Sequence, residues 1–424
     1  MLRVGLLALV LLVLAAPARA QAPALDVPPG TSAAKVLVIG TDGTRFDLVQ
    51  RLMDAGEAPH LRALAQDGFA LPSVLQYRPP GALTLSEVGW TTIATGVWPA
   101  KHGVRGYALN NDPGQATKNG HLDLLSRLER ERPRLSTFLA SNWANLGLHR
   151  NGGPIFGDAV DAGFAIAAPD DVEGWDAADQ EVADVAARQL RERGPDASVV
   201  YFGVVDEAAH LVGSATPRYR QAIRDLDRRV GQLLDAIRAR PTYAGEQWTV
   251  LVTTDHGQQD LAAPSAFSHG GGSDLERTSF VLASGFGVPR VPARPLWVVD
   301  LAPSVFVRLG VAVERAWDLD GRAFTTAPAV PAPTAAVRRR GRTLRITVRA
   351  PAGAPALRSV AVRGGAARAS RRVRAADGAR RVRLTVRLGR PAPALVRVTT
   401  TDTTGAATAT TVRVAGRSAA RGRR

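Results

Sequence analysis

The chain has 424 residues, of which 45% are hydrophobic and 22% are charged, and this predicts two or three globular domains. It contains no cysteine, which excludes disulfides and thiolate metal ligands, so that any metal ion would be held by oxygen and imidazole. The net charge of +16 comes from residues 331–424, which contain 23 arginines and two acidic residues, whereas residues 1–330 carry 31 basic and 36 acidic side chains.

The first 20 residues have the three parts of a secretory signal peptide. Arg3 gives a basic start, the apolar run GLLALVLLVLAA follows, and Ala18-Arg19-Ala20 forms an A-x-A cleavage site. A membrane anchor is the alternative, but the run is shorter than the roughly 18–20 residues that a spanning helix needs. We therefore predict a secreted, periplasmic or cell-surface protein, with an N-terminal lead at 21–33 and no transmembrane segment after cleavage.

Strand-like and helix-like segments alternate over residues 34–325. Continuous apolar runs typical of buried parallel strands lie at 35–40, 198–206, 248–255 and 277–285. Helices are predicted at 58–68, 90–96, 219–240 and 298–310. The alternation predicts an α/β domain with a doubly wound sheet and helices on both faces.

Aspartates end three of the predicted strands, and histidines follow each of the later two. The aspartates are Asp42, Asp206 and Asp255, and the histidines are His210, His256 and His269. Doubly wound sheets bind ligands beyond the carboxyl ends of their strands, and converging buried carboxylates need a positive partner. No run of lysine or arginine lies beside them. A pair of divalent metal ions is the simplest partner, and carboxylate with imidazole suits zinc.

Ser86 stands just before the predicted helix WTTIATG, outside any G-x-S-x-G context and without an obvious histidine base nearby. A divalent cation can lower the pKa of a hydroxyl group bound to it, and a helix N-terminus favours an anion. Ser86 is therefore a candidate nucleophile that needs no histidine base. The alternative interpretation is a helix N-cap.

Five motifs, in this order, resemble the alkaline phosphatase superfamily, and most closely its type I phosphodiesterase/nucleotide pyrophosphatase family. They are TDG at 41–43, the serine preceding TTIATGVWPAKHGV, DEAAH at 206–210, TDHG at 254–257 and SHGG at 268–271. WDLDGRAF at 317–324 is similar to the usual end of that domain. The resemblance implies an alkaline-phosphatase-like fold with two zinc ions, one held by Asp42, Ser86, Asp255 and His256 and the other by Asp206, His210 and His269.

The resemblance also implies that Ser86 attacks phosphorus and forms a covalent phosphoenzyme intermediate. Threonine is the nucleophile in the eukaryotic-type pattern, where this chain has serine. Two phosphate-contacting asparagines of the family are replaced here by Gly89 and Tyr107, and Asn110 and Asn111 are candidates to substitute for them. The motifs therefore specify the type of reaction better than they specify which leaving group the enzyme prefers.

The remaining histidines and the tryptophans receive mainly structural interpretations. Histidines interpreted as structural or solvent-facing are His60, His121 and His149, while His102, inside a family motif, is interpreted as a packing residue. Four tryptophans could stack on a base or sugar, although core packing is expected for most: Trp90, Trp98, Trp143 and Trp175. Asp300 is predicted to cap the helix that follows it.

A Pro/Ala linker at 326–337 precedes a basic region of different character. Segments within 338–416 alternate apolar residues with Arg or Thr and are separated by Gly, Pro and Asp, which predicts a small C-terminal β-sandwich of the Ig/fibronectin-like kind. A basic tail follows at 417–424. The arginines form either a solvated face or a surface for an anionic cell-surface polymer, nucleic acid or acidic lipid headgroups. No aromatic residues are interleaved for base stacking. TTTDTTGAATATTVRV resembles strands of bacterial fibronectin- or immunoglobulin-like modules appended to exported enzymes, so we favour an accessory surface-adhesion role over a catalytic one.

The sequence therefore predicts an exported two-metal hydrolase of small phosphoric esters, acting on phosphodiesters or nucleotide pyrophosphate bonds. A phosphomonoesterase on the same site is the first alternative, and the lack of a Lys-x-Arg near the site weighs against it. The second is a non-catalytic surface-binding protein with a degenerate enzyme domain. A sulfatase is disfavoured because SEVGW lacks the C/S-x-P-x-R signature.

Overall fold

The computed structural model divides into two compact units, with the boundary between Ala327 and Pro328. We call them the N-terminal and C-terminal units. The described residues are 25–106, 115–147, 154–157, 159–328, 334–340, 343–350, 357–364, 370–374, 379–387, 395–402 and 407–413. The predicted signal peptide at 1–20, the tail at 417–424, and Tyr107, Asn110, Asn111 and His149 lie outside them.

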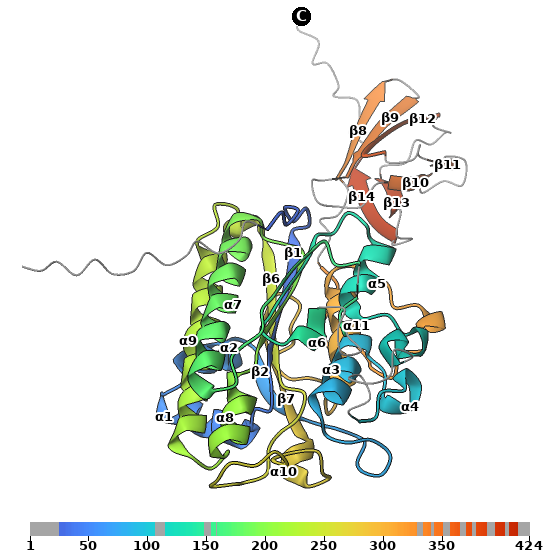
Figure 1. The fold of residues 1–424 in the computed structure, drawn as a ribbon. Helices are drawn as coiled ribbons and strands as arrows, with labels where there is room; N and C mark the ends of the chain where they lie inside the picture. Colours follow the sequence, from blue (N-terminus) through green and yellow to red (C-terminus); the bar gives the residue numbers. More distant parts are fainter. Residues whose placement is uncertain are drawn as a thin grey trace, which may run out of the picture. The chain divides into compact units, whose positions relative to one another are not determined.

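The N-terminal unit is built on a seven-stranded, mostly parallel sheet in the order β2-β7-β6-β1-β5-β3-β4 (Figure 1). Its strands are β1 (Ala34–Thr41), β2 (Phe69–Val74), β3 (Thr137–Ser141), β4 (Ala162–Ala165), β5 (Ala197–Phe202), β6 (Gln247–Thr253) and β7 (Thr278–Gly285). β7 runs antiparallel to both β6 and β2, and the other pairs are parallel. The predicted α/β sheet is therefore present, with one antiparallel strand that the apolar pattern alone does not distinguish.

Helices cover both faces of this sheet (Figure 1). One face carries α1 (Phe46–Ala55), α2 (Pro59–Asp67), α7 (Val172–Glu192), α8 (Val204–Val212) and α9 (Pro217–Arg238), and the other carries α3 (Ser86–Thr95), α5 (Leu124–Glu131), α6 (Ala144–Gly147) and α11 (Leu301–Arg308). Two further short helices are α4 (Pro99–His102) and α10 (Asp274–Arg277). Along β1, Leu37 and Ile39 join one apolar core, while Val36 and Val38 join the other. The two-residue period of the strand thus supplies both cores.

Strand β5 is shorter than the apolar run 198–206 predicts. It ends at Phe202, and Gly203 precedes helix α8, so that Asp206 lies in the first turn of a helix rather than at a strand end. The run stays apolar because both the end of the strand and the start of the helix are buried. The i, i+4 spacing then places Asp206 and His210 on one helix face.

The C-terminal unit contains two small antiparallel sheets, ordered β11-β10-β13-β14 and β12-β9-β8. Their strands are β8 (Thr334–Arg340), β9 (Thr343–Arg349), β10 (Leu357–Gly364), β11 (Ser370–Arg374), β12 (Arg381–Arg387), β13 (Leu395–Asp402) and β14 (Ala407–Arg413). Apolar residues of both sheets, such as Ile346 and Val360, belong to one buried cluster. β8 begins within the stretch interpreted as linker, and β11 is a further strand that the pattern did not indicate.

Candidate metal centre

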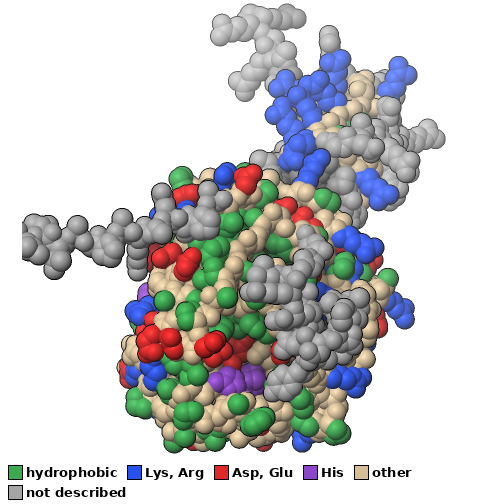
Figure 2. Space-filling view, viewed as in Figure 1, with side chains coloured by type: hydrophobic (Ala, Val, Ile, Leu, Met, Phe, Trp, Pro, Cys, Tyr) green, Lys and Arg blue, Asp and Glu red, His purple; other side chains and the backbone are tan. Residues whose placement is uncertain are grey.

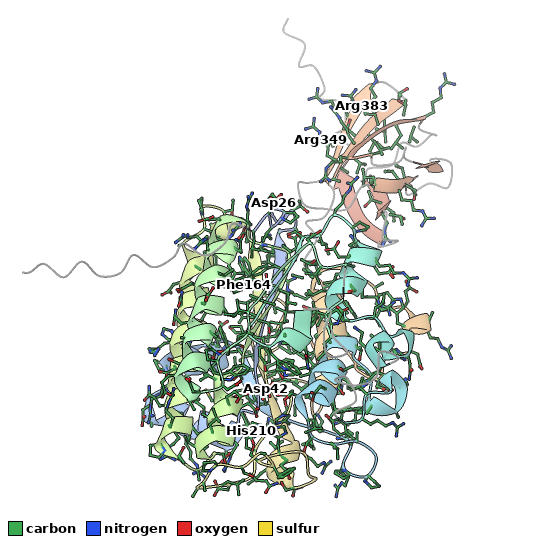
Figure 3. All side chains as sticks on the ribbon, viewed as in Figure 1. Asp26, Asp42, Phe164, His210, Arg349 and Arg383 are labelled. Atoms are coloured by element: carbon green, nitrogen blue, oxygen red, sulfur yellow. The ribbon has the colours of Figure 1, made fainter. Side chains whose placement is uncertain are left out.

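The three strands at the middle of the sheet bring the three predicted aspartates together. β1 pairs with β5 on one side and with β6 on the other, so their carboxyl ends are adjacent. Asp42 directly follows β1, Asp255 follows β6, and Asp206 follows β5 through the first turn of α8. These carboxylates are 1%, 0% and 7% exposed, respectively. Figure 3 shows Asp42 and His210 at this end of the sheet.

Ser86 is the first residue of α3, and its hydroxyl group faces the aspartates. Ser86 Oγ lies 3.1 Å from Asp42 Oδ1 and 3.3 Å from His256 Nε2. His256 Nε2 in turn lies 3.2 Å from Asp255 Oδ2 and 3.6 Å from Asp42 Oδ1. Contacts of 3.1–3.6 Å therefore connect the serine, one imidazole and two of the carboxylates.

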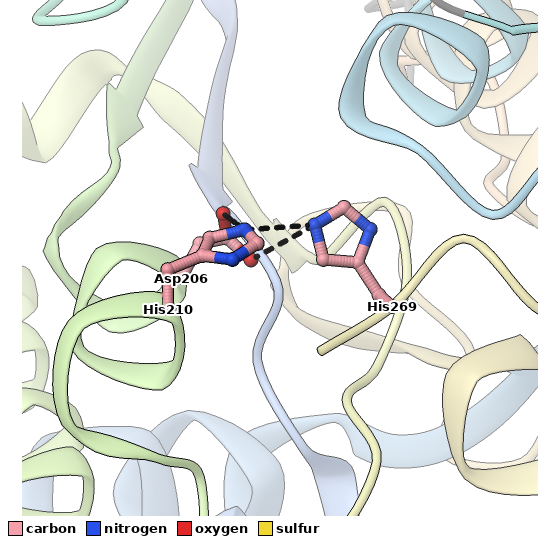
Figure 4. Close-up of side chains that lie close together, drawn as sticks. All are labelled: Asp206, His210 and His269. Atoms are coloured by element: carbon pink, nitrogen blue, oxygen red, sulfur yellow. Dashed lines mark hydrogen bonds and ion pairs between the residues drawn. The ribbon is translucent and has the colours of Figure 1, made fainter. Parts of the chain in front are cut away.

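The second set joins α8 to the loop that precedes α10. Asp206 Oδ2 lies 3.2 Å from His210 Nε2, and Asp206 Oδ1 lies 3.7 Å from His269 Nε2. The two Nε2 atoms are 3.0 Å apart, and the rings point toward each other across the carboxylate (Figure 4). The rings of His269 and His256 stack with centroids 3.9 Å apart, which places the two sets side by side.

Backbone carbonyl groups orient all three imidazoles in the same way. His210 Nδ1 faces Ser265 O at 3.0 Å, His256 Nδ1 faces Gly257 O at 2.9 Å, and His269 Nδ1 faces Thr84 O at 2.7 Å. A carbonyl oxygen only accepts hydrogen bonds, so Nδ1 carries the proton in each ring and Nε2 presents a lone pair when the ring is neutral. This arrangement is typical of histidines that bind metals through Nε2.

The pKa shifts of the aspartates and of His210 indicate that this cluster of side chains favours added positive charge. Burial raises the pKa of Asp42 to about 6, with a further contribution from the charge of Asp206, and burial raises the pKa of Asp255 well above its ordinary value. Burial alone would lower the pKa of His210, but the Asp206 carboxylate outweighs it and raises that pKa to about 10. Burial lowers the pKa of His269 to about 4. The buried carboxylates favour a nearby positive charge, and either a proton on His210 or a cation bound between the ligands would supply it.

The donor atoms fit divalent metal ions. Ligand atoms about 2.0–2.1 Å from one tetrahedral zinc ion are about 3.3 Å apart, and the neighbouring donor atoms described above are separated by 3.0–3.7 Å. Asp255 Oδ2 is buried and accepts no hydrogen bond in the described part of the chain. Such an oxygen is costly unless a cation binds it. Two overlapping groups of side chains have ligand atoms close enough together to hold a metal ion. One group is Asp206, His210 and His269, and the other is Asp42, Asp206 and His256.

Two aromatic side chains that the sequence did not assign to the site support Asp42. Tyr201 donates its hydroxyl hydrogen to Asp42 Oδ2 at 2.6 Å, and Trp90 donates from Nε1 to the same oxygen at 2.8 Å. The other oxygen of this carboxylate, Oδ1, faces Ser86 Oγ. Tyr201 lies within the buried strand β5, and Trp90, one of the four tryptophans for most of which core packing was expected, lies within α3. Only the sheet order, which makes β5 the neighbour of β1, brings the Tyr201 hydroxyl group to Asp42.

A cavity of about 190 Å³ opens over these residues. Asp42, Ser86, Asp206, His210 and His269 line it, together with Leu85, Glu87, Trp143, Trp175, Tyr201, Gly203, Glu207 and Ala266. Of the four tryptophans considered from the sequence, Trp143 and Trp175 border the cavity. No lysine or arginine lines it within the described residues.

Other sequence expectations can be placed as well. His102 is fully buried, with Nε2 3.0 Å from Thr92 Oγ1 and Nδ1 accepting from the Val104 N–H at 3.1 Å, which suits a packing residue and not a ligand. The expectation for Asp300 is wrong, because its side chain caps no N–H of α11. It accepts instead from Trp297 N at 2.8 Å and pairs with Arg294.

The family model described as type I phosphodiesterase/nucleotide pyrophosphatase matches residues 36–269, more than half of the chain and all seven candidate site residues. The chain belongs to this family. Human ectonucleotide pyrophosphatase/phosphodiesterase family member 7 is 26% identical over 236 residues, which cover 53% of this chain and 47% of that protein. The mouse protein of the same name is 23% identical over 241 residues, with shares of 53% and 49%. The chain thus spans about half the length of the curated relatives it matches.

Among solved structures, a putative sulfatase from Bacteroides thetaiotaomicron superposes with a TM-score of 0.51 at 13% identity, covering 83% of this chain and 85% of that chain. At this identity the likeness shows the shared fold only.

Gly89, where the family resemblance leads one to expect asparagine, packs closely against Asp255. An added Cβ at this position of α3 would lie 2.7 Å from Asp255 Cβ and 2.9 Å from Asp255 O. Real Cβ atoms do not approach so closely, so an asparagine would force α3 away from β6. The contact that family asparagines make with a phosphate oxygen cannot come from residue 89 in this backbone.

Proposed function

We propose that the protein is an exported, two-metal hydrolase of phosphoric diesters or nucleotide pyrophosphate bonds, with Ser86 as nucleophile. Membership of the phosphodiesterase/nucleotide pyrophosphatase family supports a hydrolase of this type. One observation carries the finer proposal: three imidazole Nε2 atoms and three buried carboxylates converge beside Ser86 Oγ.

The candidate ligands form two groups, and each group would bind one metal ion. Asp42, Ser86, Asp255 and His256 would hold one divalent ion, most simply zinc, and Asp206, His210 and His269 would hold the other. When bound, such ions lower the pKa of a hydroxyl group or water and neutralise charge on a transferring phosphoryl group. The carbonyls of Ser265, Gly257 and Thr84 fix the three rings for this task.

Ser86 would form a bond from Oγ to phosphorus as it gives up its hydroxyl proton. The bond from phosphorus to the leaving oxygen breaks in the same displacement, and the leaving group takes up a proton and departs as an alcohol or a phosphate. The other ester group stays on phosphorus, so the intermediate is a seryl phosphodiester. Water then attacks its phosphorus, the bond from phosphorus to Oγ breaks, and Oγ takes a proton from the water as the phosphomonoester is released. The N-terminus of the ten-residue helix α3 adds a favourable field for the phosphoryl anion at Ser86.

The cavity supports a diester over a monoester. The phosphoryl group of a monoester carries two negative charges, and an additional lysine or arginine would compensate the second. Within the described residues the cavity presents Glu207 and no such cation. The indole rings of Trp143 and Trp175 supply an apolar wall for the group attached to the phosphate.

Export and the domain plan remain part of this proposal. The signal-peptide pattern at 1–20 supports export, and no helix in the described residues is long and apolar enough to cross a membrane. The two small sheets and their shared apolar cluster support an Ig/fibronectin-like accessory module after the hydrolase domain.

The test is hydrolysis of matched nitrophenyl phosphate diester and monoester by the purified chain, beside Ser86→Ala and the control Ser73→Ala. Ser73 is a buried serine whose hydroxyl group has no hydrogen-bond partner in the described structure, so its loss should leave turnover unchanged. Diester turnover that disappears only in Ser86→Ala supports the proposal. Preference for the monoester would make the protein a phosphomonoesterase, and bound metal with no turnover of either ester would favour a binding protein.

A further inference from the structure

One face of the C-terminal unit is an array of arginines. On β9 and β12, alternate side chains are buried in the apolar cluster, and the residues between them are exposed or partly exposed. The exposed arginines on this face of the β12-β9-β8 sheet are Arg338, Arg345, Arg349, Arg381, Arg383 and Arg387. In Figure 2 many blue side chains, the colour of lysine and arginine, lie on the surface of this unit, and Figure 3 labels Arg349 and Arg383. We call these six residues the arginine face.

Strand register sets like charges against one another on this face. Arg349 pairs directly with Arg381, and Arg345 pairs directly with Arg338. Like charges opposite each other destabilise a sheet, and none of the six arginines forms an ion pair in the described residues. Desolvation and then the charges of Arg383 and Arg349 lower the pKa of Arg381. An ordinary solvated face would mix both signs of charge and avoid this repulsion.

The chemistry of the face restricts its partner. The whole segment 331–424 contains no phenylalanine, tyrosine or tryptophan, so it has no platform on which nucleic-acid bases could stack. Guanidinium groups bind phosphate oxygens in a bidentate manner. A linear chain of phosphates would follow one line across the sheet, whereas these arginines spread in two dimensions over three strands. A planar array of phosphates matches that spread better.

We propose that the arginine face binds a membrane surface rich in acidic phospholipid headgroups. This proposal is independent of the hydrolase activity, because it rests only on the C-terminal unit. Each basic residue near such a surface strengthens binding about fivefold, and salt screens the attraction within a Debye length of about 8–10 Å. Several arginines acting together would give reversible, salt-sensitive binding without any inserted apolar anchor.

The experiment measures sedimentation of the full chain with vesicles of phosphatidylcholine, with and without phosphatidylglycerol. The double variant Arg349→Gln/Arg381→Gln removes one opposed pair. Its matched control, Arg358→Gln/Arg397→Gln, removes the same charge from exposed positions on the other sheet of the unit. Arg349→Lys/Arg381→Lys keeps the charge and tests whether the substituted strands still fold.

We expect the parent and the lysine variant to bind the acidic vesicles and not the neutral ones. Partitioning of Arg349→Gln/Arg381→Gln should fall by roughly 10- to 30-fold, because two membrane-facing charges are lost, with a much smaller loss in the control. Equal losses in both glutamine variants would overturn the proposal in favour of attraction by net charge. The proposal would also be overturned if the chain did not bind acidic vesicles. If soluble polyphosphate abolished vesicle binding by forming a tighter complex with the chain, the result would instead favour a polymer partner.

Discussion

His210 Nε2 and His269 Nε2 lie 3.0 Å apart, although the other nitrogen of each ring faces a backbone carbonyl. Two neutral imidazoles held in this way would direct lone pairs at each other. Asp206 adds a carboxylate to both, so the three side chains together favour a positive charge between them. Helix α8 supplies two of these groups, and the loop before α10 supplies the third, so a shared cation would link the two segments.

Replacing Tyr201 with phenylalanine should weaken metal binding without unfolding the protein. The Tyr201 hydroxyl group donates to Asp42 Oδ2 at 2.6 Å, and partners of this kind orient a ligand carboxylate. Their loss typically lowers metal affinity by about 10- to 100-fold. Competition with a chromophoric chelator measures the change, with Tyr243→Phe, a 41%-exposed tyrosine, as control. Unchanged affinity in Tyr201→Phe would mean that the hydrogen bond has no part in holding a metal.

Restoring the family asparagine at position 89 should harm the protein. Gly89→Asn must move α3 or β6, because a Cβ there meets Asp255 at 2.7 Å. Overpacking of this kind typically costs about 1–3 kcal/mol of unfolding free energy, and Asp255 should be displaced from its ligand position. Urea unfolding and metal content report both effects. The control is Gly163→Ala, where an added Cβ meets nothing within 4 Å. A Gly89→Asn chain as stable and as metal-rich as the parent would refute the close contact.

His102 should make stability depend on pH below neutrality. Burial first, and then the charge of His121, lower the pKa of His102 to about 3, whereas the ordinary value is 6.5. The unfolded chain therefore binds more protons than the folded chain between these values, and the contribution is complete above pH 6.5 and is lost as pH falls toward 3. Between pH 7 and pH 5 the loss amounts to about 2 kcal/mol.

This contribution can be isolated by comparing the parent with His102→Gln. The other titrating groups are common to both chains, so the fall in unfolding free energy from pH 7 to pH 5 should be smaller in the variant by up to about 2 kcal/mol. Urea unfolding at the two pH values gives the comparison. Parallel pH profiles for the two chains would show that His102 is protonated as easily in the folded state as in the unfolded state.

The ordered motifs drew attention to seven side chains that lie close together in the structure, because each stands beside a strand end, a glycine or a helix start. Composition and spacing also indicated the parallel sheet around β1, whose residues are all buried. The sequence misplaced Asp206 at a strand end because apolar strand and apolar helix are continuous at Gly203. Periodicity alone cannot separate a buried strand from the buried first turn of a helix.

The supporting residues could not be predicted, because their contacts depend on the order of strands. Tyr201 reads as one more apolar residue of β5, and only pairing with β1 turns its hydroxyl group into a donor to Asp42. The cavity wall was indicated only in part. Trp143 and Trp175 were among four tryptophans that could stack on a base or sugar, but no local pattern singled out these two, because Trp143 follows β3 and Trp175 lies in α7. Strand β8 was hidden because its first residues continue the Pro/Ala composition of the linker.

The most direct test of the metal centre is the metal content of the purified chain, measured by elemental analysis beside His269→Ala and His60→Ala. His60 is the second residue of helix α2 and lies outside both groups of potential ligands. We expect two zinc or similar divalent ions per chain in the parent and in His60→Ala, and about one in His269→Ala. A parent chain that binds no divalent metal, even after zinc is supplied, would rule out the proposed metal centre.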